Sequence, residues 1–261
     1  MSLTNLPRAV IEVAYAEYAR EYLRSLPLEH FIEATAQGTQ RKITLESFDL
    51  VHARRPEVQA FNELLVQYPR RGQDRPGQIV PDNMVVLCDK PIDADGSYDV
   101  PLQPVGPFWV MEYVSKYNKR KDYEKSFDKY ERELKVPYYL TFYPDNQELT
   151  LYHLRGRKYV SVKPNEHGRY AVPELEMEIA LLDGWVRFWY QGALLPLPAE
   201  LQQRAERAEQ RAETAEQRAE TAEQRAETAE QQIAREREAR LALERELEEL
   251  RRQLKRKSKP S

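Results

Sequence analysis

One acidic residue stands where packing alone does not explain it. Glu112 lies in the middle of the most apolar run of the chain, FWVMEYV at 108–114. Apolar residues occupy both alternating positions of this run, which predicts a strand buried on both faces of a sheet. A carboxylate in such a strand is costly unless a proton, a cation or a metal ion compensates its charge. Glu112 is therefore the first candidate for a functional residue.

Asp82 is the candidate partner of Glu112. It begins the β-rich run DNMVVL at 82–87, and a loop of about twenty residues separates this run from the strand of Glu112. Two neighbouring strands linked in this way can bring both carboxylates to one ion. Two carboxylates with backbone oxygen and water suit Mg²⁺, with Mn²⁺ as the alternative. Such an ion polarises a phosphodiester and activates a bound water, which predicts metal-assisted hydrolysis.

The elements that must position these two acids can be read from the hydrophobic pattern. An amphipathic helix is expected over 8–26, and a second, short one after Thr44 that stops before Pro56. Strands are expected over 58–68, 78–88 and 108–114, with a loop between 89 and 107. A helix over 122–134 precedes a strand over 138–143 and a hairpin over 149–162, and the segments 175–182 and 185–190, the latter rich in Trp, close the domain. The order strand, helix, strand predicts an α/β fold with a mixed central sheet flanked by helices.

The stretch from about residue 80 to residue 182 resembles the Uma-two family within the PD-(D/E)xK restriction-endonuclease-like superfamily. The resemblance rests on Val80-Pro81-Asp82, on WVMEYVS at 109–115, on the helix at 122–130, on VPYYL at 136–140 and on PELE at 173–176. It implies an endonuclease core in which Asp82 and Glu112 are the catalytic acids and bind Mg²⁺. It also implies an early acidic residue near the site, to which Glu33 corresponds.

The chain departs from the family pattern at the catalytic lysine. The superfamily places a lysine two residues after the glutamate, where this chain has Val114. The family often moves that lysine to four residues before a tyrosine, and counting back from Tyr130 gives Ser126. Lys125 is adjacent and becomes the candidate, with Lys116 and Lys121 as weaker ones. A shift of one residue turns a helical side chain by about 100°, so adjacency alone does not give Lys125 the role of the family lysine.

A basic loop follows the strand of Glu112. Residues 115–121, SKYNKRK, place four cations directly after the candidate metal strand. Contact with the phosphates of nucleic acid, DNA in the first instance, is the functional interpretation. A solvated basic loop is the alternative of equal weight. The four candidate nucleic-acid-binding residues are Lys116, Lys119, Arg120 and Lys121.

From Ala205 the sequence repeats AERAEQR, AETAEQR, AETAEQR and AETAEQQ with a strict seven-residue period. With Ala205 at heptad position a, positions a and d hold Ala through four heptads and mostly Ile or Leu afterwards, to Leu254. Within the repeats no opposite charges are spaced three or four residues apart, so ion pairs inside one helix do not explain the pattern. Arg at g and Glu at the following e have the spacing used between parallel chains. We expect a homo-oligomer formed through residues 205–254, with a lone exposed helix as the alternative.

Bulk composition limits the remaining possibilities. The net charge is −3, a single cysteine (Cys88) excludes an intrachain disulfide, and no apolar run approaches membrane-spanning length. A cytoplasmic protein without membrane association is expected. Its parts are an N-terminal helix (1–28), the endonuclease-like domain (29–197) and an Ala-rich coiled coil with a basic tip (198–261). Two other functions compete with the nuclease: a catalytically impaired module that binds nucleic acid or protein, and a coiled-coil scaffold.

Overall fold

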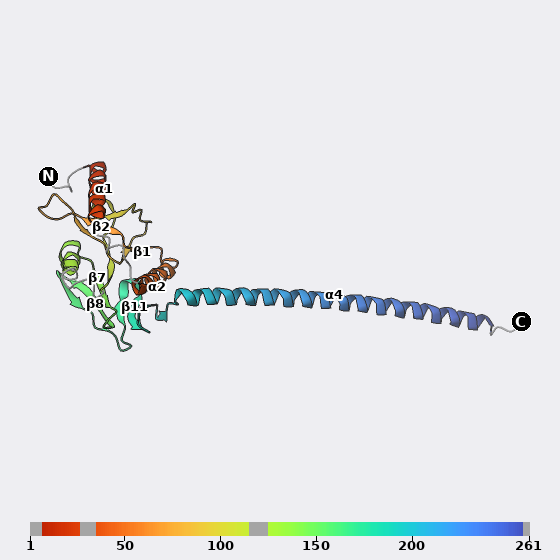
Figure 1. The fold of residues 1–261 in the computed structure, drawn as a ribbon. Helices are drawn as coiled ribbons and strands as arrows, with labels where there is room; N and C mark the ends of the chain where they lie inside the picture. Colours follow the sequence, from red (N-terminus) through yellow and green to blue (C-terminus); the bar gives the residue numbers. More distant parts are fainter. Residues whose placement is uncertain (1–6, 27–34, 115–124, 258–261) are drawn as a thin grey trace. The chain divides into compact units, whose positions relative to one another are not determined.

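The computed structural model describes residues 7–26, 35–114 and 125–257 of the chain. The chain forms two compact units, Met1–Pro198 and Ala199–Ser261, which are described separately (Figure 1).

A six-stranded sheet forms the centre of the first unit. Its order is β1-β4-β6-β7-β8-β9. The strands are β1 (Val58–Asn62), β4 (Asn83–Leu87), β6 (Trp109–Tyr113), β7 (Tyr138–Tyr143), β8 (Glu148–Arg155) and β9 (Lys158–Ser161). The neighbours β6 and β7 are parallel, whereas the other adjacent pairs are antiparallel. Helical residues 125–128 and the π-helix η4 (Lys129–Leu134) lie in the crossover between β6 and β7. The predicted mixed sheet is therefore confirmed.

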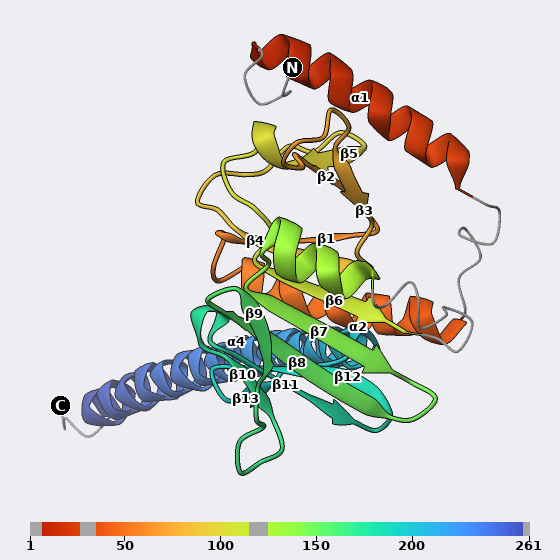
Figure 2. The same cartoon turned by 90° about the vertical axis from the view of Figure 1, so that its left-hand side faces the viewer.

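Two smaller sheets and two helices complete this unit. The three-stranded sheet has the order β3-β2-β5, and the four-stranded sheet has the order β10-β11-β12-β13. Helix α1 (Arg8–Ser25) lies over the three-stranded sheet, and α2 (Thr35–His52) packs against β1 and β12 (Figure 2). The remaining elements are β2 (Leu65–Tyr68), β3 (Gly77–Ile79), β5 (Ser97–Asp99), η3 (Val100–Leu102), β10 (Tyr170–Val172), η5 (Pro173–Leu175), β11 (Met177–Leu182), β12 (Trp185–Tyr190) and β13 (Ala193–Leu194).

Three expectations about the strands were wrong. The segments 58–68 and 78–88 are not single strands, because each contributes one strand to the six-stranded sheet and one to the three-stranded sheet. Glu63 has a left-handed backbone (φ 46°) that ends β1, and Pro81, which has no N–H for a ladder, lies between β3 and β4. The expected loop at 89–107 also contains β5 and η3.

Helix α2 begins earlier than expected, at Thr35 instead of after Thr44. Its buried face carries polar residues, which hides the helical periodicity in the sequence. Gln40 is 1% exposed, and its side chain bonds both backbone groups of Val186, at 3.1 and 2.9 Å. Because these hydrogen bonds satisfy the amide, Gln40 can occupy a core position that a hydrophobic pattern does not reveal.

The six-stranded sheet is covered on both faces, as the sequence predicted for the strand of Glu112. Trp109 and Met111 face a core formed with α2 and the four-stranded sheet. Val110 faces a second core, formed with the three-stranded sheet and with Tyr130 of η4. Since side chains alternate along a strand, Glu112 points to the same side as Val110.

A close approach in the three-stranded sheet requires glycine at position 77. A Cβ atom at Gly77 would lie 2.2 Å from the ring of Tyr68, which is itself buried. We therefore expect Gly77→Ala to lower the free energy of unfolding by about 1–3 kcal/mol through overpacking. Gly106→Ala is the matched control, because a Cβ atom there meets no atom within 4 Å. Urea denaturation of both variants checks this, and equal losses would contradict the steric explanation.

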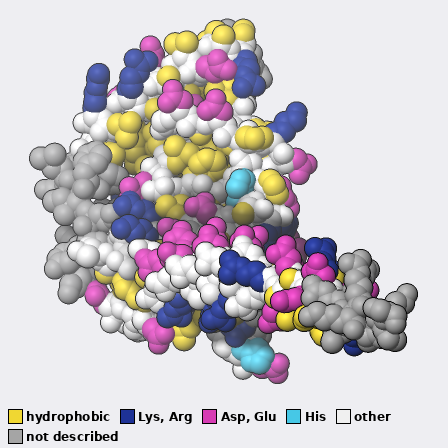
Figure 3. Space-filling model, turned by 90° about the vertical axis from the view of Figure 1, so that its right-hand side faces the viewer, with side chains coloured by type: hydrophobic (Ala, Val, Ile, Leu, Met, Phe, Trp, Pro, Cys, Tyr) yellow, Lys and Arg dark blue, Asp and Glu magenta, His cyan; other side chains and the backbone are white. Residues whose placement is uncertain are grey.

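Helix α4 (Pro198–Lys257) forms the second unit from its second residue onward. Acidic side chains gather along one side of this helix (Figure 3). Among the residues that the structure describes, no helix is both long and apolar enough to cross a membrane.

Candidate active site

Strand register brings the two predicted acids together. Asn83 of β4 is opposite Met111 of β6, so continuing this antiparallel register by one residue places Asp82 opposite Glu112. The backbone N–H of Tyr113 donates to Oδ2 of Asp82 at 2.5 Å. This bond fixes the carboxylate of Asp82 against the strand that carries Glu112.

Both carboxyl groups hold their protons more tightly than usual. Burial raises the pKa of Glu112 well above its ordinary value, and the neighbouring charge of Asp82 raises it further. Burial also raises the pKa of Asp82 to about 6, with a smaller contribution from the charge of Glu63. The N–H of Tyr113 opposes this shift because it stabilises the ionised form. Two adjacent carboxylates that are costly as anions form a site whose electrostatics a bound cation would relieve.

The donor set fits a hard divalent ion. Two carboxylates supply the hard oxygen ligands that Mg²⁺ prefers, and Mg²⁺ keeps several waters when it binds to protein. Within residues 7–26, 35–114 and 125–257, no group of three or more His, Cys, Asp or Glu could hold a metal. An ion held by Asp82 and Glu112 would therefore complete its shell with water or backbone oxygen. Positions held by water can be taken by a substrate oxygen or can supply the attacking water, which a catalytic metal needs.

A row of polar residues crosses the sheet at the level of these acids. The register of β1 with β4, continued by one residue, places Glu63 opposite Asp82. Glu112 is opposite Thr141, and Thr141 is opposite Thr150. The chain thus places polar side chains at the same level on five adjacent strands or their ends.

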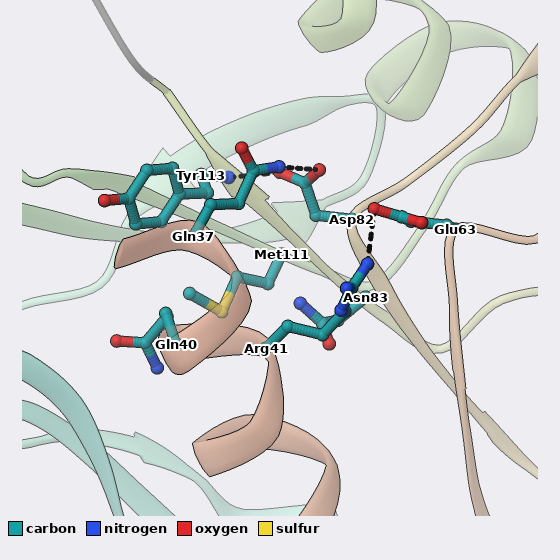
Figure 4. Close-up of a pocket in the computed structure, with 8 residues that line it drawn as sticks. All are labelled: Gln37, Gln40, Arg41, Glu63, Asp82, Asn83, Met111 and Tyr113. Carbon is teal, nitrogen blue, oxygen red and sulfur yellow. Dashed lines mark hydrogen bonds and ion pairs between the residues drawn. The ribbon is translucent and has the colours of Figure 1, made fainter. Parts of the chain in front are cut away.

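Helix α2 contributes polar groups beside Asp82. Gln37 donates from Nε2 to Oδ1 of Asp82 at 3.2 Å, and Arg41, four residues later, forms an ion pair with Glu63 at 2.6 Å (Figure 4). These residues line a small pocket together with Asn83, and the pocket has room for about one water molecule. Oδ1 of Asn83 is buried and accepts no hydrogen bond from any residue that the structure describes. A water molecule in the pocket would satisfy it.

Gln37, Arg41 and Glu63 were not predicted as site residues. Gln37 and Arg41 are spaced one helical turn apart, and this was the available signal, but the helix was expected to begin after Thr44. Nothing in the sequence near Glu63 indicates its role, because it reaches Asp82 through strand pairing.

Tyr130 is the second contact of Glu112. Its hydroxyl donates to Oε1 of Glu112 at 2.5 Å, and its ring is fully buried. Tyr130 lies in the π-helix η4, whose wider turn is visible in the bond from the N–H of Lys135 to the carbonyl of Tyr130. Short π-helical segments inside helices are frequent at functional sites. The sequence did not predict a role for Tyr130 in the site; it marked only the position from which the lysine position was counted.

The candidate lysine lies on the helical stretch before Tyr130. Lys125 is exposed, and Ser126 is half-buried at the position one turn before Tyr130. The other predicted residues, Glu33 and the basic residues Lys116, Lys119, Arg120 and Lys121, lie outside the described part of the chain.

We expect Tyr130→Phe to weaken the binding of Mg²⁺ about 10-fold at pH 7. In the wild type the hydrogen bond from the Tyr130 hydroxyl lowers the pKa of Glu112. Without this hydroxyl the pKa rises further, so protons compete more strongly with the metal. Tyr138→Phe is the matched control, because Tyr138 donates to the carboxylate of Glu174 at 2.8 Å elsewhere in the domain. Titration of thermal stability with Mg²⁺ measures the affinity, and equal affinities for the two variants would contradict a positioning role for Tyr130.

The mixed sheet, the helical crossover between β6 and β7, and the pair Asp82 and Glu112 define a restriction-endonuclease-like class of protein. The Uma2 family model, described as "Putative restriction endonuclease", matches residues 29–182, more than half of the chain. The chain therefore belongs to the Uma2 family, which confirms the resemblance inferred from its motifs.

Comparison with solved structures gives a match to a protein titled a "putative nuclease" from Anabaena variabilis ATCC 29413. The two share 16% identity with a TM-score of 0.42, over 55% of this chain and 75% of the other. No curated protein matches the chain.

Proposed function

We propose that the protein is a Mg²⁺-dependent endonuclease that hydrolyses phosphodiester bonds of nucleic acid, DNA in the first instance. The observation that carries this proposal is the pair Asp82 and Glu112, two adjacent carboxyl groups with raised pKa values in a chain of a nuclease family. Packing does not account for two half-buried acids side by side, whereas a shared metal ion does.

The proposed roles follow from the contacts of each residue. Asp82 and Glu112 would hold Mg²⁺, or Mn²⁺ in its place, and the ion would supply Lewis-acid polarisation of the phosphodiester and a water of lowered pKa. The N–H of Tyr113 orients Asp82, and the hydroxyl of Tyr130 orients Glu112. Each bond holds one oxygen of its carboxylate in place before any ion binds, which favours a preorganised site.

The remaining proposed residues act on the substrate. Lys125 would stabilise the charge that develops on the phosphate, with Lys116 or Lys121 as weaker candidates. Glu33 would be the additional acid near the site. Lys116, Lys119, Arg120 and Lys121 would bind the phosphate backbone. We further propose that residues 205–254 hold the protein in a homo-oligomer, which gives two sites for the two strands of a duplex.

The second candidate function is a nuclease-derived module that binds nucleic acid or protein without cutting. Ser126 at the lysine position favours it, and the intact acidic pair opposes it. A coiled-coil scaffold is the third candidate; the Ala-only seam over four heptads, which buries little area, weighs against it.

Incubation of supercoiled plasmid with purified protein and Mg²⁺ or Mn²⁺ tests the proposal. We expect nicking by the wild type, and a loss of at least 100-fold for Asp82→Asn and Glu112→Gln. Glu174→Gln is the matched control, because Glu174 is also a hydrogen-bonded carboxylate of the domain but lies outside the pair. Equal nicking by all four proteins would indicate a contaminant. Binding of the plasmid without nicking would favour the non-cutting module.

A further inference from the structure

Helix α4 exposes an apolar stripe in its second half. Ile233 is 64% exposed, Leu243 61%, Leu247 53% and Leu250 52%. All four occupy positions a and d of the heptad repeat that begins at Ala205. An isolated helix gains nothing from such a stripe, whereas a partner helix with the same period would bury it.

The charges in the Ala-rich heptads that precede the stripe oppose a lone helix. The acidic residues at b and e follow one another at intervals of three and four residues, so like charges are neighbours along one side of the helix. They are Glu213, Glu216, Glu220, Glu223, Glu227 and Glu230. Arginine occupies g, on the other side of the Ala seam, at Arg211, Arg218 and Arg225. One helix therefore carries an acidic row and a basic row, separated by the surface that would pair.

We infer that α4 pairs with α4 of a second copy of this chain in a parallel, in-register, two-stranded coiled coil. In a parallel pair, position g of one helix lies beside the following e of the other, so Arg211 meets Glu216 of the second copy. In an antiparallel pair, g lies beside g and e beside e, so two Ala-rich segments, which carry Arg at g and Glu at e, would repel each other. Within the Ala-rich heptads the charge pattern is attractive only in the parallel arrangement. This inference rests on the proposed self-association and adds its orientation and register.

The interruption of the stripe fixes the register. Identical AETAEQR heptads would allow the helices to slip by seven residues at little cost. Glu236 at d and Arg240 at a break the apolar stripe one turn apart. In register, the two copies bring together two glutamates and two arginines, which pair across the interface. A slip by one heptad would place Arg240 against Ile233 or Leu247 and leave buried charges without partners.

A second pair supports the same register. Glu246 at g lies beside Arg251 at e of the other copy, with the signs reversed relative to the Ala-rich heptads. A slip by one heptad in one direction would place Glu246 beside Glu244, which repels. Because the domains precede α4 in the chain, a parallel coil attaches both of them to the same end.

Site-directed disulfide formation tests the orientation. In a Cys88→Ser background, which removes the single native cysteine, Ala208→Cys is expected to cross-link to itself in most of the protein. A mixture of Ala208→Cys with Leu247→Cys reports an antiparallel pair, in which d lies opposite a, and a mixture of Ala208→Cys with Ala215→Cys reports a slipped one. A mixed disulfide as the main product of either mixture would overturn the inference.

Charge reversal tests the pairing without cross-linking. The triple variant Arg211→Glu, Arg218→Glu, Arg225→Glu is expected to raise the dissociation constant of the pair at least 100-fold, because each g to e contact of these three residues becomes repulsive. Its mixture with Glu216→Arg, Glu223→Arg, Glu230→Arg is expected to restore pairing. In an antiparallel pair, g contacts g and e contacts e, so the variants at e would not compensate the reversed charges at g, and the mixture would not restore pairing.

The matched control reverses three charges at b, outside the g and e contacts: Glu213→Arg, Glu220→Arg, Glu227→Arg. It is expected to pair as the wild type does. Sedimentation of the full chain measures the mass, for which the wild type should give twice 30.7 kDa. A wild-type protein that is monomeric at micromolar concentration would contradict the proposed self-association and, with it, the parallel pair. These readouts are independent of nuclease activity, so failure of the proposed catalysis would leave them unchanged.

Discussion

Replacing Asp82 by Asn is expected to raise the stability of the metal-free protein at pH 8 and to abolish its stabilisation by Mg²⁺. The pKa of Asp82 is raised from 3.8 to about 6 because burial disfavours the charged form. Asn keeps an oxygen that can accept the N–H of Tyr113 but has no charge to bury. The substitution therefore separates the electrostatic cost of the site from its hydrogen bonding.

The sign of the pH dependence follows from the direction of the shift. A carboxyl group with a raised pKa binds its proton more tightly in the folded protein than in the unfolded chain. Its contribution to stability is fully present below the unfolded pKa and is lost as pH rises through the folded pKa, from about 4 to about 6. At pH 8 the ionised Asp82 therefore destabilises the wild type by up to about 3 kcal/mol, since one pKa unit corresponds to about 1.4 kcal/mol. The raised pKa of Glu112 acts in the same direction.

Thermal unfolding between pH 4 and pH 8 measures this effect, with and without Mg²⁺. Asp82→Asn should melt several degrees above the wild type at pH 8 and close to it at pH 4. Saturating Mg²⁺, at about 100 times its Kd, should stabilise the wild type by about 3 kcal/mol and the variant not at all. The exposed Asp95→Asn is the control and should behave as the wild type. A variant that is less stable than the wild type at pH 8 would show that the acid is structural.

Ser126→Lys is expected to increase the nicking rate at least 10-fold. Ser126 occupies the position of the family lysine, four residues before Tyr130, and is half-buried on the helix that carries Tyr130 to Glu112. A single donor directed at developing charge in an active site contributes about 100- to 1,000-fold to the rate. We expect a smaller gain, of at least about 10-fold, because position 126 is half-buried around a serine and a lysine there must be accommodated.

Lys125→Ala in both backgrounds identifies which cation acts. If Lys125 serves the wild type, Lys125→Ala abolishes nicking there but not in the Ser126→Lys protein. Adding Asp82→Asn to Ser126→Lys should remove the gain, because the lysine acts only together with the metal. The absence of any gain in Ser126→Lys, with full activity in Lys125→Ala, would place the catalytic cation elsewhere in the chain.

The sequence by itself determined features that arise from local periodicity and local turn chemistry. Apolar residues at both parities around Glu112 indicated a strand covered on two faces, and two cores cover it. The hairpin over 149–162 was predicted, and Gly156 in its turn has the left-handed backbone (φ 67°) that glycine adopts readily. The heptads after Ala205 indicated one long helix, which α4 is. In each case residues close in the chain carry the whole signal.

Tertiary structure alone decided how the site is assembled. The opposition of Asp82 and Glu112 depends on the register of β4 with β6, and the approach of Glu63 depends on the register of β1 with β4. The sequence also did not predict that residues 58–68 are divided between two sheets, because the residues of a strand do not specify which strands it pairs with. Gln37 reaches Asp82 across 45 residues of chain, from a helix whose polar buried face concealed it. Strand pairing and helix docking are contacts between distant segments, and only the folded chain brings their side chains within hydrogen-bonding distance.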